Sequence, residues 1–171
     1  LKPKINSEDK GELSRQIIEQ GFALLSRSFD PTHGGFGTAP KFPAPHNLTF
    51  LLRYGLADKN KKAWQLVEKT LTQMYKGGIF DHIGYGFARY STDRQWLVPH
   101  FEKMLYDNAL LTIAYLETYQ ATGKELFRQV AEQIMEYVLR DLTARKEPFF
   151  RRRMLILKER RANSIFGVIK R

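Results

Sequence analysis

The chain has 171 residues, of which 43% are hydrophobic and 13% aromatic, enough for one domain with a buried core. It contains no cysteine, which excludes disulfides, thiolate metal sites and Cys-x-x-C redox pairs. The net charge of +10 is uneven, because residues 144–171 carry ten basic against two acidic side chains. The basic character therefore belongs to a short C-terminal segment, and the first 143 residues are nearly neutral.

No apolar run approaches the length of about 20 residues that crosses a bilayer, so no membrane span is expected. The first residues lack the apolar stretch of a secretory signal, and the chain does not begin with methionine. We therefore expect a cytoplasmic protein, and we expect that this chain starts inside a larger one.

Apolar residues at helical spacing predict five helices in the first 143 residues, which indicates an all-α fold. Proline near a helix start and glycine after a helix end support several boundaries. The fourth helix is apolar almost all round, which is typical of a buried helix. The expected helices span residues 7–27, Pro45 to at least Leu56, 61–76, Pro99 or His100 to 122, and 124–142.

Two of these helices are followed by glycine-rich loops. The first loop contains Gly34 and Gly35, and the third helix runs into Gly77 and Gly78. The order helix, Gly-Gly loop, helix and short turn is a weak internal repeat, which predicts stacked helical hairpins. A closed ring of hairpins would gather these loops on one side, around a shared cavity. The loop of residues 79–98 is the longest, and long loops inside compact domains are often functional.

The basic segment at residues 144–171 does not match the rest of the chain. Plausible codons for it, read in a neighbouring frame, can spell Thr-Ser-Pro-Glu-Gly-Ala-Phe-Phe-Ser-Ala-Glu-Asp, with a third Gly-aromatic turn. We interpret the segment as a frameshift product that follows a domain of residues 1–143. The alternative is a nucleic-acid-binding arm, but Arg151–Leu157 shows neither aromatic interleaving nor a reading helix. No nucleic-acid partner is therefore expected.

Three runs of residues carry a resemblance to a known family. They are Gly34 to Pro43, Gly77 to Asp93 and Trp96 to Ala109, within a match that covers about residues 5–142. On these runs the chain resembles the thioredoxin-domain-containing proteins related to spermatogenesis-associated protein twenty. The reframed tail spells a segment of the same family, which supports the frameshift interpretation.

The resemblance implies a two-part protein, in which a thioredoxin-like domain precedes a large (α/α) toroid. That toroid is similar to N-acylglucosamine 2-epimerases and six-hairpin glycosidases, and sugar chemistry is implied only through this kinship of folds. The thioredoxin-like domain is missing from this chain and would be its partner in the complete protein. The chain would hold about two and a half hairpins of stacked helices, an incomplete (α/α) toroid.

Ionisable residues gather where the long loop meets the expected fourth helix. By helical spacing, His100, Lys103 and Asp107 share one face of that helix, and Glu102 and Tyr106 share another. Such groups at the mouth of a buried helix are costly unless they are paired or used. We interpret them as lining a cavity in which His100 or Glu102 moves protons.

A structural network is the alternative to this interpretation. In it, Glu102 pairs with Lys103 or Arg89, and Asn108 caps a loop. The aromatic residues of the long loop have two interpretations as well, because they can stack on a sugar or pin the loop to the body. Arg89 could hold a carboxylate or phosphate with two parallel hydrogen bonds.

Asp81 together with Glu102 would suit a glycosidase, which needs a defined separation of two carboxyl groups. The candidate catalytic residues are thus His100, Glu102, Asp81 and His82. The candidate substrate-binding residues are Arg89, Tyr90, Trp96, Lys103, Tyr106, Asp107, Asn108, Lys41 and Phe42. The spacing of the four histidines matches no standard metal site, and neither a metal nor a cofactor is expected.

Two functions follow from these observations. The complete protein would be a sugar isomerase, epimerase or glycosidase-like enzyme with a carbohydrate ligand, and this fragment would be inactive alone. Alternatively, the toroid is a non-enzymatic binding or scaffold domain that serves its thioredoxin-like partner. An incomplete ring also exposes faces that further hairpins would cover, so self-association is expected.

Overall fold

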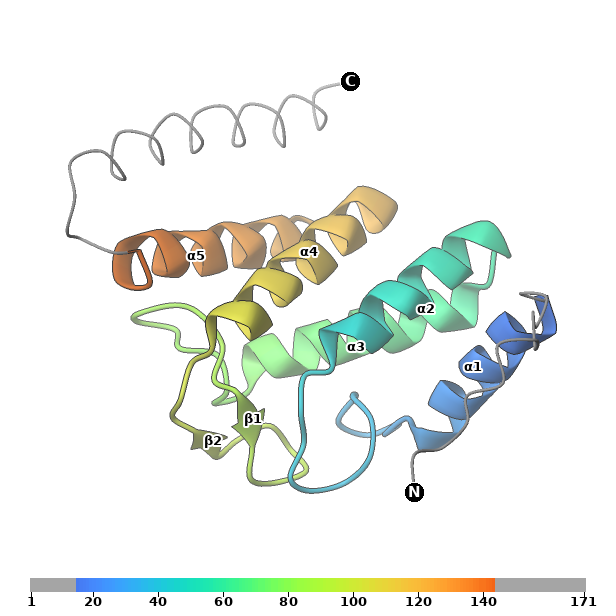
Figure 1. Ribbon diagram of the computed structural model, residues 1–171, viewed down its shortest axis with the longest axis horizontal. Coiled ribbons are helices and arrows are strands. Elements are labelled where there is room, and N and C mark those ends of the chain that lie inside the picture. Colours follow the sequence, from blue (N-terminus) through green and yellow to red (C-terminus); the bar gives the residue numbers. More distant parts are fainter. Residues whose placement is uncertain (1–14, 144–171) are drawn as a thin grey trace, which may run out of the picture.

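The computed structural model describes residues 15–143, in which helices predominate (Figure 1). A single two-stranded antiparallel sheet in this part of the chain pairs Tyr90 with His100 and Ser91 with Pro99. The elements are α1 (Arg15–Ser28), α2 (Pro45–Ala57), α3 (Lys61–Lys76), β1 (Tyr90–Ser91), β2 (Pro99–His100), α4 (Leu105–Thr122) and α5 (Glu125–Asp141).

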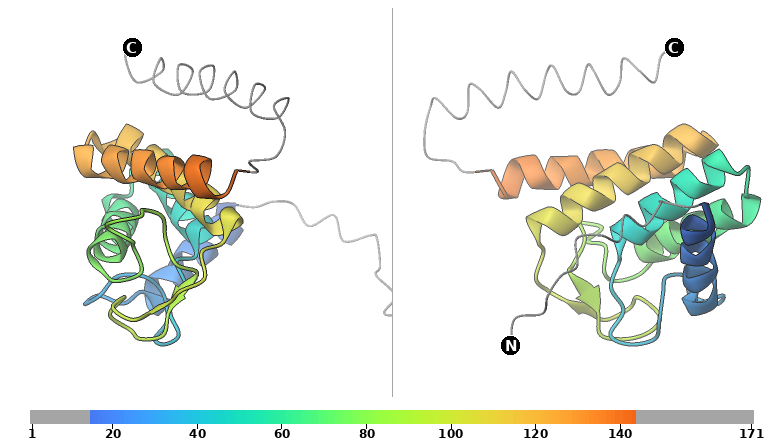
Figure 2. Two further views of the ribbon diagram at one scale, coloured as in Figure 1. Left: turned by 90° about the vertical axis from the view of Figure 1, so that its left-hand side faces the viewer. Right: turned by 45° about the vertical axis from the view of Figure 1, so that its right-hand side comes forward.

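The helices form two hairpins, α2 with α3 and α4 with α5, and the hairpins stack through α2 and α4. Arg53 on α2 donates two hydrogen bonds to Glu117 on α4, of 3.2 and 2.6 Å. The short turns that close the two hairpins lie at one end of the stack, and the long loops with β1 and β2 lie at the other (Figure 2). The expected stacking of helical hairpins is confirmed.

Local signals account for several helix ends. The side chain of Asn60 accepts a hydrogen bond from the Ala63 amide, which caps the start of α3. Gly123 ends α4 in the left-handed conformation, with φ of 68°, which glycine adopts without strain. Pro45 occupies the first turn of α2, where its missing amide hydrogen removes no helical bond.

One hydrophobic core joins both hairpins to the long loop. Apolar side chains at helical spacing on α2, α3, α4 and α5 meet there, together with residues of the loop itself. Burial of this surface is the main favourable contribution to folding. The largest side chains with essentially no exposed surface are Trp96, Tyr115, Lys41, Phe87, Phe127, Leu48, Leu51, Leu52, Leu71, Met74, Ile79 and Leu111.

The predicted start of the fourth helix is wrong. Pro99 and His100 form strand β2, and α4 begins only at Leu105. The backbone of this segment pairs with the preceding loop instead of with itself, because the Arg89 amide donates to the Glu102 carbonyl at 2.7 Å. The shared helical faces predicted for His100 and Glu102 are therefore wrong too, since both residues precede the helix.

The prediction that α4 is buried all round is also wrong. One face carries the buried Asn108, Leu111, Ala114, Tyr115 and Thr118. On the opposite side Leu105, Leu110 and Ile113 are 52%, 42% and 44% exposed. The apolar sequence of α4 therefore marks two faces, one in the core of this chain and one open.

The start of the expected first helix, residues 7–14, and the basic segment 144–171 lie outside the described residues. The domain boundary at residue 143 and the frameshift interpretation therefore stay predictions. Within residues 15–143, none of the helices has the length and apolarity needed to span a membrane.

Candidate functional site

A buried ion pair lies within the loop between α1 and α2, at one end of the helices. The Nζ atom of Lys41 lies 2.8 Å from Oδ2 of Asp30, and neither side chain has more than 1% exposure. The same Nζ atom donates to the carbonyls of Gly34 and Arg94, at 2.8 and 2.9 Å. All three hydrogens of the ammonium group are thus used, as a buried charge requires.

Arg94 approaches the same carboxylate from the second loop. Its guanidinium donates to both oxygens of Asp30, at 2.7 and 3.0 Å. Burial by itself raises the pKa of Asp30, but the hydrogen bonds from Arg94 and Lys41 outweigh it and leave that pKa well below its usual value. Asp30 is therefore a permanent negative charge that holds two cations from separate segments.

Trp96 explains why glycines recur in both loops. Its side chain has no exposed surface, and its Nε1 donates to the His33 carbonyl at 2.9 Å. A Cβ atom on Gly35 would lie 2.5 Å from the indole ring, and one on Gly77 would lie 2.4 Å from the Trp96 carbonyl. Gly35 also has a positive φ, of 76°. Each Gly-Gly loop thus contributes a glycine that allows close approach to one tryptophan.

An aromatic stack crosses the outer side of these loops. The rings of Phe42 and Tyr90 are 4.9 Å apart, and those of Tyr90 and His100 are stacked at 4.7 Å. Two backbone hydrogen bonds between Lys41 and Ser91, of 2.8 and 2.9 Å, fix the register that brings Phe42 to Tyr90. Phe42 is 47% exposed, so the stack presents aromatic surface to solvent.

Charged residues adjoin this stack. Arg89 Nη1 lies 3.1 Å from Glu102 Oε2, and His100 Nδ1 lies 4.0 Å from the same oxygen. Tyr106 and Asp107, in the first turn of α4, lie near the Arg89 guanidinium. Burial raises the pKa of Asp107, and the positive charge of Arg89 offsets only part of that effect.

The structure therefore brings Phe42, Arg89, Tyr90, His100, Glu102, Tyr106 and Asp107 into one partly exposed group, which we call the loop-face cluster. All seven were predicted as site residues. The pairing of Glu102 with Arg89 is also the one that the structural alternative predicted. The binding-site interpretation and the structural-network interpretation thus share the Arg89–Glu102 contact. The partial exposure of the loop-face cluster is the feature that a ligand site requires in addition.

Asp81 and Lys103 form a separate pair. Lys103 Nζ lies 2.8 Å from Asp81 Oδ2 and donates to the Tyr85 carbonyl at the same distance. The hydrogen bond from Lys103 and the amide of Gly84 lower the pKa of Asp81 to about 2. A carboxyl group with this pKa stays ionised at neutral pH, so Asp81 is unsuited to the predicted role of a proton donor. His82 packs edge-on against Phe80.

Three predicted binding residues lie in the core. Asn108 accepts from the Phe87 amide at 2.7 Å and donates to the Phe87 and Met104 carbonyls, so its side chain holds the long loop to α4. Lys41 and Trp96 are equally buried. A direct contact between a ligand and these three side chains, as the sequence predicted, does not fit their burial. Their contacts position the exposed residues instead.

Two features escaped the sequence analysis. Asp30 and Arg94 were not singled out, although a loop that buries a lysine needs a carboxylate partner.

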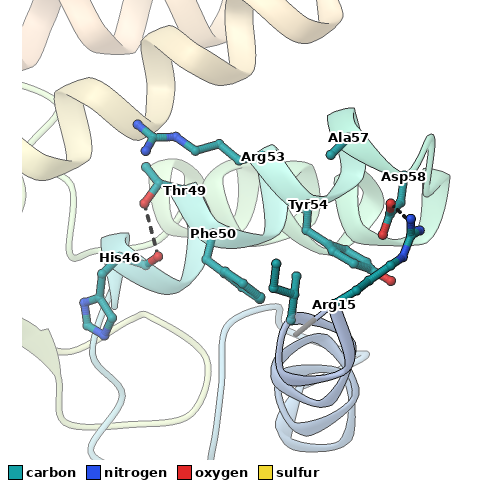
Figure 3. A pocket seen from close by; sticks show the side chains of 9 residues that line it. Arg15, His46, Thr49, Phe50, Arg53, Tyr54, Ala57 and Asp58 are labelled. Atoms are coloured by element: carbon teal, nitrogen blue, oxygen red, sulfur yellow. Dashed lines mark hydrogen bonds and ion pairs between the residues drawn. The ribbon is translucent and has the colours of Figure 1, made fainter. Parts of the chain in front are cut away.

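An open pocket of about 580 Å³ also lies between α1 and α2, lined by Arg15, His46 and Phe50 among others (Figure 3). The cations at its rim are engaged, because Arg15 binds Asp58 and Arg53 binds Glu117. Across residues 15–143, no three His, Asp or Glu side chains gather as metal ligands would.

Comparison of sequences shows which known proteins this chain is related to. Over 133 residues it is 48% identical to human spermatogenesis-associated protein 20, and the rat protein of that name is 47% identical. An uncharacterised protein of Caenorhabditis elegans is 38% identical over 144 residues. The chain is a homologue of part of spermatogenesis-associated protein 20.

The matched region of spermatogenesis-associated protein 20 is a small part of that protein. The alignment covers 75% of this chain and 17% of the human protein, and it covers 81% of this chain and 20% of the C. elegans protein. No family model matches the chain.

Solved structures show which fold this chain shares. Cellobiose 2-epimerase from Spirochaeta thermophila matches with a TM-score of 0.57 and 23% identity, over 72% of this chain and 35% of the epimerase. The enzyme from Bacillus thermoamylovorans matches with a TM-score of 0.61 and 15% identity, over 74% and 38%. The chain thus forms about a third of an (α/α) toroid, which confirms the predicted fold class.

Proposed function

We propose that the loop-face cluster forms part of the wall of a carbohydrate-binding cavity. The observation that carries this proposal is the exposed aromatic stack of Phe42, Tyr90 and His100 beside the Arg89–Glu102 pair. It lies where the loops of successive hairpins gather, in a fold shared with cellobiose 2-epimerases. Aromatic faces next to a few polar groups are typical of small-molecule sites.

The proposed activity of the complete protein is sugar epimerisation or isomerisation. His100 and Glu102 would carry protons, because imidazole and carboxyl groups are common general acids and bases and the neighbouring carboxylate can orient the imidazole. A glycosidase needs two carboxyl groups that act on one bond, and the engaged Asp81 is a poor second member. The proton-transfer role therefore favours epimerisation over glycoside cleavage. With only a third of the ring, this chain is expected to bind weakly and to lack turnover.

Binding is tested by titrating the ¹⁵N-labelled chain with cellobiose and following amide chemical shifts. We expect shifts at Phe42, Tyr90 and His100, and their loss in the Phe42→Ala variant. Leu24→Ala removes an exposed apolar side chain from α1, far from the cluster in sequence, and serves as the control. Absence of shifts, or shifts confined to the pocket between α1 and α2, would overturn the proposal.

Turnover is tested in the complete protein that contains this region. Incubation with cellobiose in D₂O should place deuterium at C2 of the reducing sugar, as proton abstraction from that carbon requires, and ¹H NMR detects the exchange. His100→Gln should abolish the exchange while the sugar still binds. Binding without exchange in the unaltered protein would contradict the enzymatic proposal.

A non-enzymatic function has one observation in its favour. Exposed apolar side chains lie on α1, at Ile17 and Ile18, and on α4, at Leu110 and Ile113. Such surfaces are typical of faces that bind other protein elements. As a second candidate we propose a scaffold domain that binds the thioredoxin-like part of the complete protein. Binding between the two parts, with neither sugar binding nor exchange, is the outcome that this candidate predicts.

A further inference from the structure

Lys41 and Phe42 are neighbours in the chain, but they lie on opposite sides of the loop between α1 and α2. The Lys41 side chain has no exposed surface, whereas Phe42 is 47% exposed and belongs to the loop-face cluster. Successive residues of an extended segment point in opposite directions, so an anchor buried at one position holds the next side chain outward. The conformation of Lys41 therefore decides where the Phe42 ring lies.

The ammonium group of Lys41 is held by both long loops. It donates to the Asp30 carboxylate and to the Gly34 carbonyl, each at 2.8 Å, in the loop between α1 and α2. Its third hydrogen bond, of 2.9 Å, goes to the Arg94 carbonyl in the loop between α3 and α4. Arg94 in turn donates from its guanidinium to both oxygens of Asp30. A lysine with three directed hydrogen bonds loses the freedom that its long side chain usually has.

The backbone of Lys41 connects this buried network to the aromatic stack. Its amide and its carbonyl both form hydrogen bonds with Ser91 of β1, of 2.8 and 2.9 Å. Ser91 follows Tyr90, whose ring lies 4.9 Å from that of Phe42 and is stacked on His100. The stack thus combines a ring from one loop with rings from the other, and it forms only while the two loops are joined.

We propose that Lys41 is a positioning residue, which holds Phe42 against Tyr90 as a preformed surface for a sugar ring. The inference rests on the proposed carbohydrate-binding function and goes beyond it, because it gives the buried ion pair a role in the site. Lys41 does not touch the ligand and acts through Phe42. A preformed stack binds more tightly than one that the ligand must first order, since ordering a side chain on binding costs affinity.

The test measures the stack first and its effect on binding second. In the free chain, nuclear Overhauser effects between the rings of Phe42 and Tyr90 report the stack. Those between Phe22 and Tyr54, whose rings lie 4.7 Å apart, report a contact outside the cluster. In Lys41→Met we expect the first set to be lost and the second to persist. The dissociation constant for cellobiose, obtained from amide shifts, should rise about tenfold, the cost of ordering one side chain on binding.

Leu52→Ala separates positioning from stability. Leu52 is 1% exposed on α2, and its carbonyl accepts a hydrogen bond from Trp64 Nε1, toward the short turn between α2 and α3. Loss of a buried leucine destabilises a protein about as much as loss of one partner of a buried ion pair. This variant should therefore unfold more easily but keep the Phe42–Tyr90 stack and the affinity for cellobiose. An equal loss of stack and affinity in Leu52→Ala would mean that Lys41 acts through stability alone, and would overturn the inference.

Arg94→Gln is a milder second variant. It removes a guanidinium that is 51% exposed, and it keeps the buried pair of Lys41 and Asp30. We expect weaker Overhauser effects between Phe42 and Tyr90, and a smaller rise in the dissociation constant for cellobiose than in Lys41→Met. Should Lys41→Met fail to fold, an unchanged stack in Arg94→Gln is the result that contradicts the positioning role.

The positioning role and the carbohydrate-binding proposal fail in different ways. If cellobiose shifts no amide signal of the unaltered chain, the carbohydrate-binding proposal is wrong, and the Overhauser effects still decide whether Lys41 holds Phe42. If cellobiose binds, and Lys41→Met keeps both the stack and the affinity, the carbohydrate-binding proposal stands and the role of Lys41 is wrong.

Discussion

Lys41 has no exposed surface, although lysine is among the residues least often buried completely. Its ammonium group is held by the Asp30 carboxylate and two carbonyls, and it lies 5.1 Å from the centre of the Trp96 ring. Such a cation–π contact further stabilises the buried ammonium group. Because the Lys41 backbone also pairs with Ser91, this residue connects the buried ion pair to the exposed aromatic stack.

Replacing this lysine tests how much the ion pair contributes. Lys41→Met keeps the aliphatic stem but removes the buried cation, and leaves Asp30 with Arg94 and the amides of Thr32 and His33. Removing one partner of a buried pair is strongly destabilising, and we expect a loss of about 3 kcal/mol in the free energy of unfolding, measured with urea. Lys76→Met, on the exposed end of α3, should change that free energy by less than about 0.5 kcal/mol. Equal stability of the two variants would contradict this account.

Asp81 makes the stability of the chain depend on pH. Its folded pKa is about 2, below the ordinary value of 3.8, so the ionised form stabilises the fold. This contribution is complete above pH 4 and is lost as the pH falls toward 2. Asp81→Asn should therefore be less stable than the unaltered chain at pH 7 and no less stable near pH 2. Thermal unfolding across this range measures the difference, and a gap that persists at pH 2 would exclude linkage as its cause.

At the scale of elements, the two loops and strand β1 form one unit around Trp96. Gly35 and Gly37 make a matched pair for testing it, because both have a positive φ, of 76° and 75°. Only Gly35 lies against the indole ring, whereas a Cβ on Gly37 would meet nothing within 4 Å. The two positions thus separate the strain of the backbone from the effect of close packing.

Alanine at these two positions should have unequal effects. Gly37→Ala brings only the strain of a left-handed residue, about 1 kcal/mol. Gly35→Ala adds a clash with Trp96 and should cost about 2 to 4 kcal/mol in total, with a matching fall in melting temperature. Near-ultraviolet circular dichroism, to which Trp64 and Trp96 both contribute, should change only in the Gly35 variant. A similar loss in both variants would mean that the loop adapts around the indole.

At the scale of the whole molecule, the described part of the chain presents an apolar face on α4 to solvent. The exposed Leu105, Leu110 and Ile113 lie on the side of α4 opposite the core. The cellobiose 2-epimerases contain about three times as much structure as the part that this chain matches. An apolar face of this kind is expected to bind another protein surface.

We therefore expect the chain to self-associate at high concentration. Multi-angle light scattering should give a mass above 20.0 kDa that rises with concentration. Leu110→Gln combined with Ile113→Gln should return the mass to that of a monomer. Ile83→Gln, which changes a side chain that is 94% exposed in a loop, should not. A monomer at every concentration would show that the open face of α4 does not drive association.

Local sequence signals predicted most of the helical fold. The bounds of α3 agree with the spacing of its apolar residues and the following Gly77, and the start of α2 at Pro45 was predicted as well. These boundaries depend on capping and on side chains within one turn, which a sequence displays directly. The residues that gather around the loop-face cluster were also named, because aromatic and ionisable side chains are dense in two short runs.

Contacts between separate segments decided where α4 begins and which site residues are buried. Pro99 and His100 were predicted as helix but pair with β1, since hydrogen bonds to a strand outside the same helical turn outweigh a local preference. The same contacts bury Lys41 and Trp96 and leave Phe42 and Asp107 accessible, a division that residue type alone does not reveal. The sequence thus determined the fold class, and the residues of the loop-face cluster were among those that it named as candidates. Only the tertiary structure separated supporting residues from accessible ones, because burial and charge pairing arise when separate segments meet.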